Sequence, residues 1–351
     1  QRVDQMTLRY TTDNYDLIDM DEMQAAPAIK NLKTVKKPNK PKSNVVRKTE
    51  KPLELKMIEA SIEQDSFKFS YHASRHEYGW IVNSLREFYE QHWFEDILGK
   101  AKGGKEATVY ICRAPERLGT PLLAAKVYRP RMFRNLRKDH LYREGRENLD
   151  VNGKVVLDER AYHAMQKRSA YGLELLHTSW VGHEFLTMQV LYDGGVDLPR
   201  PYASSNNAIM MDYIGDEFNA APALNEINLT PTEARPLFQR VLHNIELMLI
   251  CNRVHADLSA YNILYWEGEI TLIDFPQAIN PEENHNAWMI FARDVQRVCD
   301  YFKGQGVACD AHSLAVKMWK SKGRATQPEI DPHFLDPEKD EDRRAWQGQK
   351  K

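Results

Sequence analysis

A chain of 351 residues with 42% hydrophobic side chains is long enough to bury a proper core, which argues against a wholly disordered protein. Its formal net charge of −2 does not indicate a nucleic-acid-binding protein, and its four scattered cysteines favour neither a zinc site nor a disulfide framework. No apolar run approaches the roughly 20 residues that span a bilayer, so we expect no membrane partner and a reducing, cytoplasmic location.

The first 65 residues are predicted to form a largely disordered tail. Acidic side chains gather over residues 13–22, and ten basic residues with interleaved prolines follow between Lys30 and Lys56. Such a stretch buries too little apolar surface to offset the entropy of ordering it. We interpret the basic part as a solvated linker, with a contact to RNA or a ribosomal subunit as the alternative. A second charged tail is expected over residues 331–351.

A folded domain is predicted over residues 66–330. It opens with a helix near residues 75–98, where apolar side chains recur at helical spacing. Two strand-like runs at 107–112 and 122–127 then predict a β-hairpin. The basic residues at 129–146 predict an exposed loop, for which a contact with RNA or phosphate is the alternative to plain solvation.

The helix with the clearest signals is predicted to begin at Pro231. Thr230 is a suitable N-cap, and Glu233 stands where a capping box requires it. Apolar residues then recur every three or four positions, and this buried stripe runs directly toward Asp257. A rigid helix is therefore expected to position that aspartate.

Further elements complete the expected fold. We predict a helix at 157–168, a strand ending at 210–214, two short strands at 262–266 and 270–274, and an amphipathic helix at 288–302. The fold class is α+β: a two-lobed, protein-kinase-like fold with a small β-rich N-lobe at about 75–210 and a helical C-lobe at about 215–325.

Three polar residues that flank the strands predicted at 262–266 and 270–274 have the spacing that phosphoryl transfer requires. Asp257 follows a buried helix and is placed to accept a proton from an attacking hydroxyl group. Asn262 and Asp274 offer the amide and carboxylate oxygens that Mg²⁺ prefers. The sequence therefore predicts a metal-assisted phosphotransferase site. His255 is interpreted as a structural histidine.

Two upstream features fit the same chemistry. The stretch from Lys102 to Ala107 contains glycines that let backbone N–H groups approach phosphates, although it is not a Walker loop. Lys126, on the second strand, is the expected partner of the α- and β-phosphates. A glutamate from a helix should pair with this lysine; Glu159 is the candidate, with Asp158 as the alternative.

These residues together resemble the RIO family of atypical serine/threonine protein kinases, and its first subfamily more than its second. The resemblance covers about residues 75–320. Its most specific parts are Gly104-Lys105-Glu106-Ala107, Met211-Asp212-Tyr213-Ile214-Gly215 followed by Ala221-Pro222-Ala223, and His255-Ala256-Asp257-Leu258-Ser259.

The resemblance implies a role for each matched position. Asp257 would be the catalytic aspartate, Asn262 and Asp274 the ligands of Mg²⁺ or alternatively Mn²⁺, and Lys126 the partner of Glu159. The residues that would bind ATP are Gly104, Lys105 and Glu106 at the phosphates and Met211, Asp212 and Ile214 at the adenine.

The resemblance also implies an activity and partners. The chain would be an ATP- and Mg²⁺-dependent serine/threonine kinase or ATPase that acts on a protein substrate or on itself. Asp274 is an acceptor candidate as well as a ligand, and the family is associated with maturation of the small ribosomal subunit.

The chain departs from the family pattern at several points. Phe275-Pro276-Gln277 has proline where a small residue is usual, and Lys102-Gly103 replaces Ser-Thr. The N-terminal extension has no family counterpart, and residues 172–205 are interpreted as a lengthening insertion.

Three alternatives stay open. A small-molecule phosphotransferase of the aminoglycoside or choline kinase type shares the Asp257, Asn262 and Asp274 pattern. A nucleotide-switched scaffold that binds RNA or ribosomes would show slow turnover. A metal hydrolase would use His72 and His76, for which no third ligand is evident.

Overall fold

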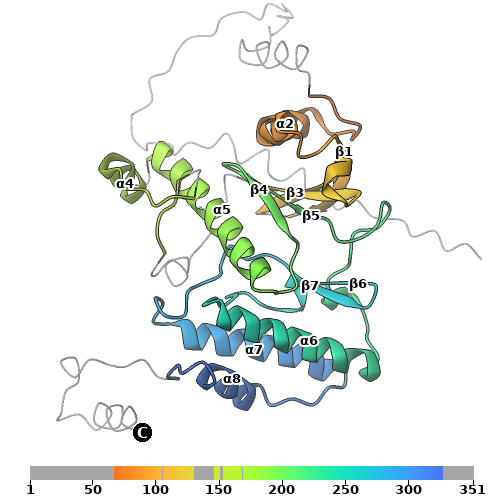
Figure 1. Ribbon diagram of the computed structural model, residues 1–351, viewed down its shortest axis with the longest axis vertical. Helices are drawn as coiled ribbons and strands as arrows, with labels where there is room; N and C mark the ends of the chain where they lie inside the picture. The colour runs from red at the N-terminus through yellow and green to blue at the C-terminus, as the bar shows by residue number, and fades with distance from the viewer. Residues whose placement is uncertain (1–66, 105, 130–145, 151–152, 168, 327–351) are drawn as a thin grey trace, which may run out of the picture. The chain divides into compact units, whose positions relative to one another are not determined.

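The computed structural model describes residues 67–104, 106–129, 146–150, 153–167 and 169–326 (Figure 1). All of them belong to one compact unit, Met57–Lys351. The tails expected at 1–65 and 331–351, the phosphate-loop residue Lys105, and most of the loop expected at 129–146 lie outside the described residues.

The N-lobe is built on a five-stranded antiparallel sheet in the order β1-β2-β3-β5-β4. The two strands predicted at 107–112 and 122–127 are present and adjacent in this sheet. The strands are β1 (Asp96–Gly103), β2 (Ala107–Arg113), β3 (Leu122–Tyr128), β4 (Pro201–Ser204) and β5 (Ala208–Asp212).

Helix α2 (Arg75–Glu90) covers the outer part of this sheet, and the prediction that it continues to residue 98 is wrong. The Ser74 side chain caps its start, and His92 adopts a left-handed backbone with φ 58° just after its end. The predicted spacing included Phe94 and Leu98. Phe94 packs into the same core as Leu85 although it lies in the connection, and Leu98 lies half-buried in β1. Apolar residues beyond the end of a helix can continue its spacing when they are buried in the same core.

In the described residues between β3 and β4, the structure has two helices. α4 (Glu159–Gln166) is short and packs on the start of α5 (Ala170–Asp193), as Figure 1 shows. The region interpreted as an insertion at 172–205 is therefore mostly helix α5, followed by strand β4. Buried residues occur along most of α5, and its second half joins the core of the C-lobe through Met188 and Leu191.

The C-lobe consists of helices α6 (Pro231–Ile250), α7 (Ala287–Gly304) and α8 (Ala311–Lys320) with a small hairpin, β6 (Ile263–Trp266) and β7 (Glu269–Leu272). The predicted capping box is formed, because Thr230 and Glu233 bond reciprocally at the start of α6. One large hydrophobic cluster joins these elements, and Phe238 of α6 packs against Phe302 of α7 with ring centroids 5.1 Å apart.

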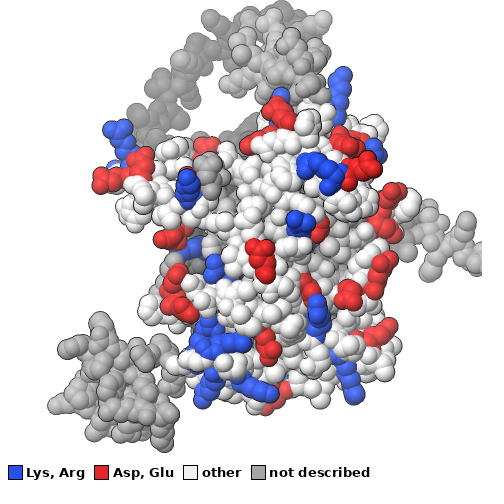
Figure 2. Space-filling view, viewed as in Figure 1, with Lys and Arg blue, Asp and Glu red and all other residues white. Residues whose placement is uncertain are grey.

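The surface of this unit is mixed in charge. Acidic and basic side chains are interspersed over the face in Figure 2. In the described part of the chain, no helix combines the length and apolar character needed to cross a membrane.

Candidate active site

Several of the predicted site residues line a cavity of about 290 Å³ between the N-lobe sheet and the β6–β7 hairpin. Its wall includes Lys126 from β3, Glu184 from α5, and Asn262 and Asp274 from the C-lobe. Five of the other predicted residues also line it, namely Gly104, Glu106, Met211, Asp212 and Ile214.

The loop that carries Asp257 is fixed from both sides. The chain leaves α6 at Ile250, and Val254 then pairs with Ile279 through two backbone hydrogen bonds of 3.0 and 2.9 Å. His255 Nε2 lies 3.1 Å from the carbonyl oxygen of Ile273, which agrees with a structural role. Ala256 has a left-handed backbone, with φ 67°, so the loop is tightly turned just before the aspartate.

Asp257 itself meets two other side chains. Asn262 Nδ2 donates to the Asp257 carbonyl oxygen at 3.0 Å, which closes the loop, and lies 3.4 Å from the carboxylate Oδ2. Arg297 Nη1 of α7 donates to Oδ1 at 2.8 Å. The carboxylate is half exposed, at 50%, and so remains accessible to an incoming acceptor.

Asp274 lies two residues beyond the end of β7 in a left-handed backbone conformation, with φ 73°. The Lys126 ammonium donates to its Oδ1 at 2.7 Å. Burial is the largest single effect and opposes ionisation of Asp274, but the opposing effects, led by the charge and the hydrogen bond of Lys126, together lower the pKa of the carboxyl group. The carboxylate is therefore held ionised at the inner end of the cavity.

Lys126 is shared between Asp274 and a glutamate, and that glutamate is Glu184. Lys126 Nζ donates to Glu184 Oε1 at 2.8 Å, and the Glu184 side chain is 1% exposed. The hydroxyl of Tyr128 donates to the other carboxylate oxygen of Glu184. Burial and then this carboxylate raise the pKa of Tyr128 well above its usual value. Both oxygens of Glu184 are thus satisfied.

The expectation that Glu159 pairs with Lys126 is wrong in this structure. Glu159 is the exposed first residue of α4, and its neighbour Asp158, the alternative, caps that helix by accepting from Arg160 N. Of the helices α4 and α5, it is α5 that packs against the sheet, so the charge partner of the strand lysine comes from α5.

The phosphate loop between β1 and β2 turns tightly. Gly104 N donates to the Ala107 carbonyl oxygen at 2.9 Å, and a Cβ on Gly104 would lie 3.1 Å from the same oxygen. Glu106 faces the cavity, where burial and then the charge of Asp274 raise the pKa of its carboxyl group. Lys105, between them, lies outside the described residues.

The hinge after β5 forms the opposite wall. The Asp212 carboxylate accepts from Tyr202 Oη at 2.7 Å and from Arg200 N at 3.1 Å, so its side chain is tied back to the β4 edge. The Ile214 carbonyl accepts from Ala221 N at 3.0 Å. Met211 is buried beneath them. The side chain of Asp212 is thus engaged by Tyr202 and Arg200, and the residue also lines the cavity.

The donor set suits a hard divalent cation. Asp274 and Asn262 line one cavity and offer a carboxylate and an amide oxygen, the ligand types that Mg²⁺ prefers. Among the described residues, no group of three or more His, Cys, Asp and Glu side chains could hold a metal. A site with few protein ligands fits Mg²⁺, which usually completes its shell with water and phosphate oxygens. The same finding does not support the hydrolase alternative at His72 and His76.

Sequence reasoning missed Glu184, Tyr128 and Arg297. The one available signal for Glu184 was a carboxylate in an otherwise apolar stretch, since such a residue is rarely buried without a partner. For Arg297 no signal was available, because its contact joins α7 to a loop 40 residues away.

Comparison with known proteins gives a consistent result. The model of the RIO domain family matches residues 139–314, about half of the chain. The chain is 29% identical over 217 residues to serine/threonine-protein kinase rio1 of Schizosaccharomyces pombe, which covers 61% of this chain and 39% of that protein. It is 31% identical over 224 residues to serine/threonine-protein kinase RIO1 of Chaetomium thermophilum, covering 60% of this chain and 40% of the relative.

One solved structure extends the comparison to the fold. It is the crystal structure of the Rio2 kinase–ADP/Mg²⁺–phosphoaspartate complex from Chaetomium thermophilum, with a TM-score of 0.50 and 18% sequence identity. The similarity covers 84% of this chain and 85% of that one. The two share a fold, which confirms the predicted two-lobed architecture. The matched region spans only about 40% of the length of the two curated relatives.

Proposed function

The chain belongs to the RIO domain family, and we propose that it catalyses transfer of the γ-phosphoryl group of ATP with the aid of Mg²⁺. The observation that carries the proposal is the convergence of Lys126, Asn262 and Asp274 on one cavity beside the half-exposed Asp257. Phosphoryl transfer depends mainly on positioning and on charge stabilisation, and these residue types supply both.

Each residue has a defined part in this mechanism. Lys126, steadied by Glu184, neutralises charge on the α- and β-phosphates. Asn262 and Asp274 would hold the cation, which when bound would shield the charge that develops on the transferred group. Asp257 accepts the proton of the acceptor hydroxyl, and its exposure leaves room for that group. The phosphate loop at Gly104, Lys105 and Glu106 and the hinge at Met211, Asp212 and Ile214 receive the nucleotide.

We further propose that the acceptor is a serine or threonine of a protein, or the chain itself. The curated relatives are named serine/threonine-protein kinases, which supports a hydroxyl acceptor. Asp274 is the alternative acceptor, in an ATPase cycle through an acyl phosphate; the related solved complex carries a phosphoaspartate. We also propose a cytoplasmic site of action and a ribosomal or RNA partner. The basic segments expected to make the contact with that partner lie outside the described residues.

The test is incubation of the purified chain with Mg²⁺ and γ-labelled ATP, with Asp257→Ala and Asp274→Ala beside the wild type. Stable label on a protein substrate, lost in Asp257→Ala, supports the serine/threonine kinase. Label that hydroxylamine releases, lost in Asp274→Ala, supports the acyl-phosphate cycle. A wild type that neither hydrolyses ATP nor acquires or transfers label contradicts the proposal and favours a nucleotide-binding scaffold.

A further inference from the structure

The segment that follows Asp274 is held by two basic side chains. Arg146 Nη2 donates to the carbonyl oxygens of Pro276 and Ala278, at 2.9 Å each. His183 Nε2 lies 3.0 Å from the same oxygen of Ala278. Because a carbonyl oxygen only accepts hydrogen bonds, His183 must donate through its Nε2–H. Three hydrogen bonds therefore converge on two carbonyl groups close to Asp274.

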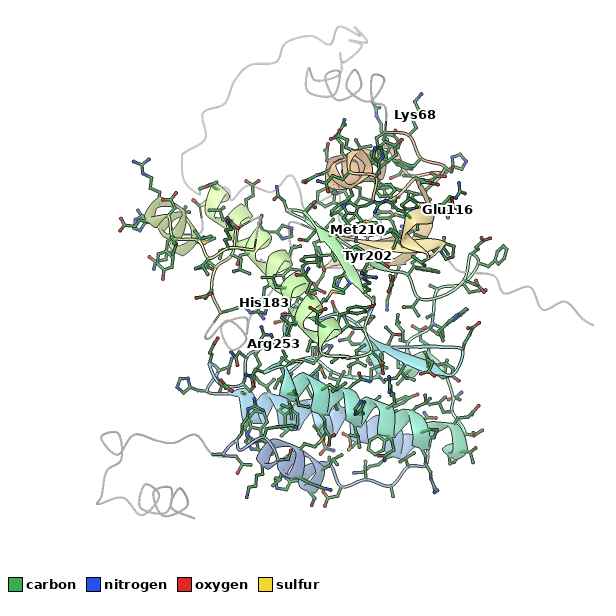
Figure 3. All side chains as sticks on the ribbon, in the orientation of Figure 1. Lys68, Glu116, His183, Tyr202, Met210 and Arg253 are labelled. Atoms are coloured by element: carbon green, nitrogen blue, oxygen red, sulfur yellow. The ribbon has the colours of Figure 1, made fainter. Side chains whose placement is uncertain are left out.

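Helix α5 sets the position of both side chains. His183 extends from the side of α5 that lies toward the C-lobe (Figure 3). Ser179, one turn earlier on the same face, accepts a hydrogen bond from Leu149 N at 2.9 Å. The Leu149 side chain is itself buried, so the short segment that begins with Arg146 is fixed to the same helix. Arg146 and His183 thus approach the loop from one rigid support.

The protonation state of His183 suits this contact. Burial, followed by the charge of Arg146, lowers the pKa of His183 to about 3. The ring is therefore neutral near pH 7 and adds no second positive charge beside the Arg146 guanidinium. A neutral imidazole with Nε2–H is the tautomer that the Ala278 carbonyl requires.

The two side chains act on the stretch between two other points of attachment. At its start, Asp274 is bonded to Lys126 and has a left-handed backbone. At its end, Ile279 pairs with Val254 through two backbone hydrogen bonds. Pro276 and Ala278 lie between these points, so the bonds to their carbonyls define the path of the chain that leaves Asp274.

We propose that Arg146 and His183 are positioning residues for the reaction, which orient the Asp274 carboxylate toward the cation by holding the Pro276 and Ala278 carbonyls. The inference rests on the proposed function, in which Asp274 is a metal ligand. Neither side chain touches the reacting atoms. Groups that orient a metal ligand from outside the ligand shell typically change metal affinity by about 10- to 100-fold when they are removed.

The first measurement is amide hydrogen exchange of the peptide covering residues 275–280 in the full chain, without nucleotide or metal. Arg146→Met and His183→Phe remove the donors. Arg117→Met is the matched control, because Arg117 Nη2 donates to the His92 carbonyl at 2.6 Å, away from the cavity. We expect exchange at least about tenfold faster in Arg146→Met and unchanged exchange in Arg117→Met.

The second measurement is the dissociation constant for ADP with and without Mg²⁺. In Arg146→Met we expect metal-free binding within about twofold of the wild type and a loss of about tenfold in the gain that Mg²⁺ brings. Arg146→Lys, which keeps a charged donor, should recover part of that gain. If Arg146→Met does not fold, His183→Phe supplies the same comparison.

The inference is overturned if both variants keep the exchange rates and the Mg²⁺ gain of the wild type. A different result bears on the proposed function: if the wild type shows no Mg²⁺ gain, that proposal loses its metal, whereas the exchange rates still decide whether Arg146 and His183 hold the loop.

Discussion

The loops that carry Asp257 and Asp274 each hold a carboxylate in an ion pair; Asp274 lines the cavity, Asp257 contacts the lining residue Asn262, and their charge partners differ in environment. Asp257 is 50% exposed and pairs with Arg297, which is 41% exposed. Asp274 is 36% exposed and pairs with Lys126, which is 12% exposed and is bonded in turn to Glu184 at 1%. The Asp257–Arg297 pair is largely exposed to solvent, whereas the Asp274–Lys126 pair is connected to the buried side chain of Glu184.

This difference has an energetic meaning. An exposed ion pair contributes about 0.2–1 kcal/mol and is screened by salt, so it is readily broken when another group arrives. A buried pair gives a large loss when one partner is removed, because the remaining charge has no compensation. We call the Asp257–Arg297 pair the acceptor side and the Asp274–Lys126–Glu184 group the metal side. The Asp257 carboxylate can therefore readily exchange Arg297 for another partner, whereas the metal side is preorganised.

The largest effect is expected from Asp274→Asn, which removes the charge that both Lys126 and the cation use. Loss of several kcal/mol of charge stabilisation corresponds to a fall in kcat of about 10³-fold or more. Release of labelled phosphate from ATP measures it, with ADP binding in the presence and absence of Mg²⁺ as a second readout. Activity within tenfold of the wild type would show that Asp274 is not the metal ligand.

Glu184→Gln should follow in size. The substitution keeps the shape but removes the charge that anchors Lys126, and hydrogen bonds to charged groups are worth about 1.5–3 kcal/mol, or roughly 10- to 100-fold in kcat/KM. Glu159→Gln is the matched control, because that residue is exposed at the start of α4. A larger loss in Glu159→Gln than in Glu184→Gln would reverse our assignment of the lysine partner.

Acid should lower the free energy of unfolding of the chain through His177 and His183 of α5. Burial lowers the pKa of His177 to about 4 and, with Arg146, that of His183 to about 3, from an ordinary 6.5. Below pH 6.5 the unfolded chain binds protons that the native chain does not, so the free energy of unfolding falls by at most about 1.4 kcal/mol per pH unit for each histidine. Urea denaturation from pH 7.5 to 4.5 measures this slope, which should be shallower in His183→Gln. An equal slope would contradict the assignment to His183.

The smallest effect is expected from Arg297→Met. An exposed pair worth up to about 1 kcal/mol predicts at most a fivefold change in kcat/KM, reduced further at high salt. Steady-state kinetics at two ionic strengths gives the comparison, with Arg297→Lys as the variant that retains the charge. A loss beyond tenfold at both ionic strengths would mean that the acceptor side is as preorganised as the metal side.

Sequence reasoning predicted which residues lie near one another where those residues are close together in the chain. Asp257, Asn262 and Asp274 lie within one loop and one hairpin, so their spacing alone nearly determines which side chains meet. The partner of Lys126 was different, because Glu184 is 58 residues away. Choosing between Glu159 and Glu184 requires knowing which helix packs on the sheet, and α5 is too uniformly apolar for its periodicity to reveal a buried face.

The same helix couples the two lobes. Trp180 and Val181 pack beside Tyr128 in the N-lobe, whereas Leu191 lies in the C-lobe core. At its end, a Cβ on Gly194 would lie 2.3 Å from Cys251 Sγ, so there is no slack at that junction. Glu184 lies on this helix between the residues that pack in the N-lobe and those that pack in the C-lobe, and it is bonded to Lys126 of the sheet. The position of its carboxylate is therefore fixed by packing in both lobes at once.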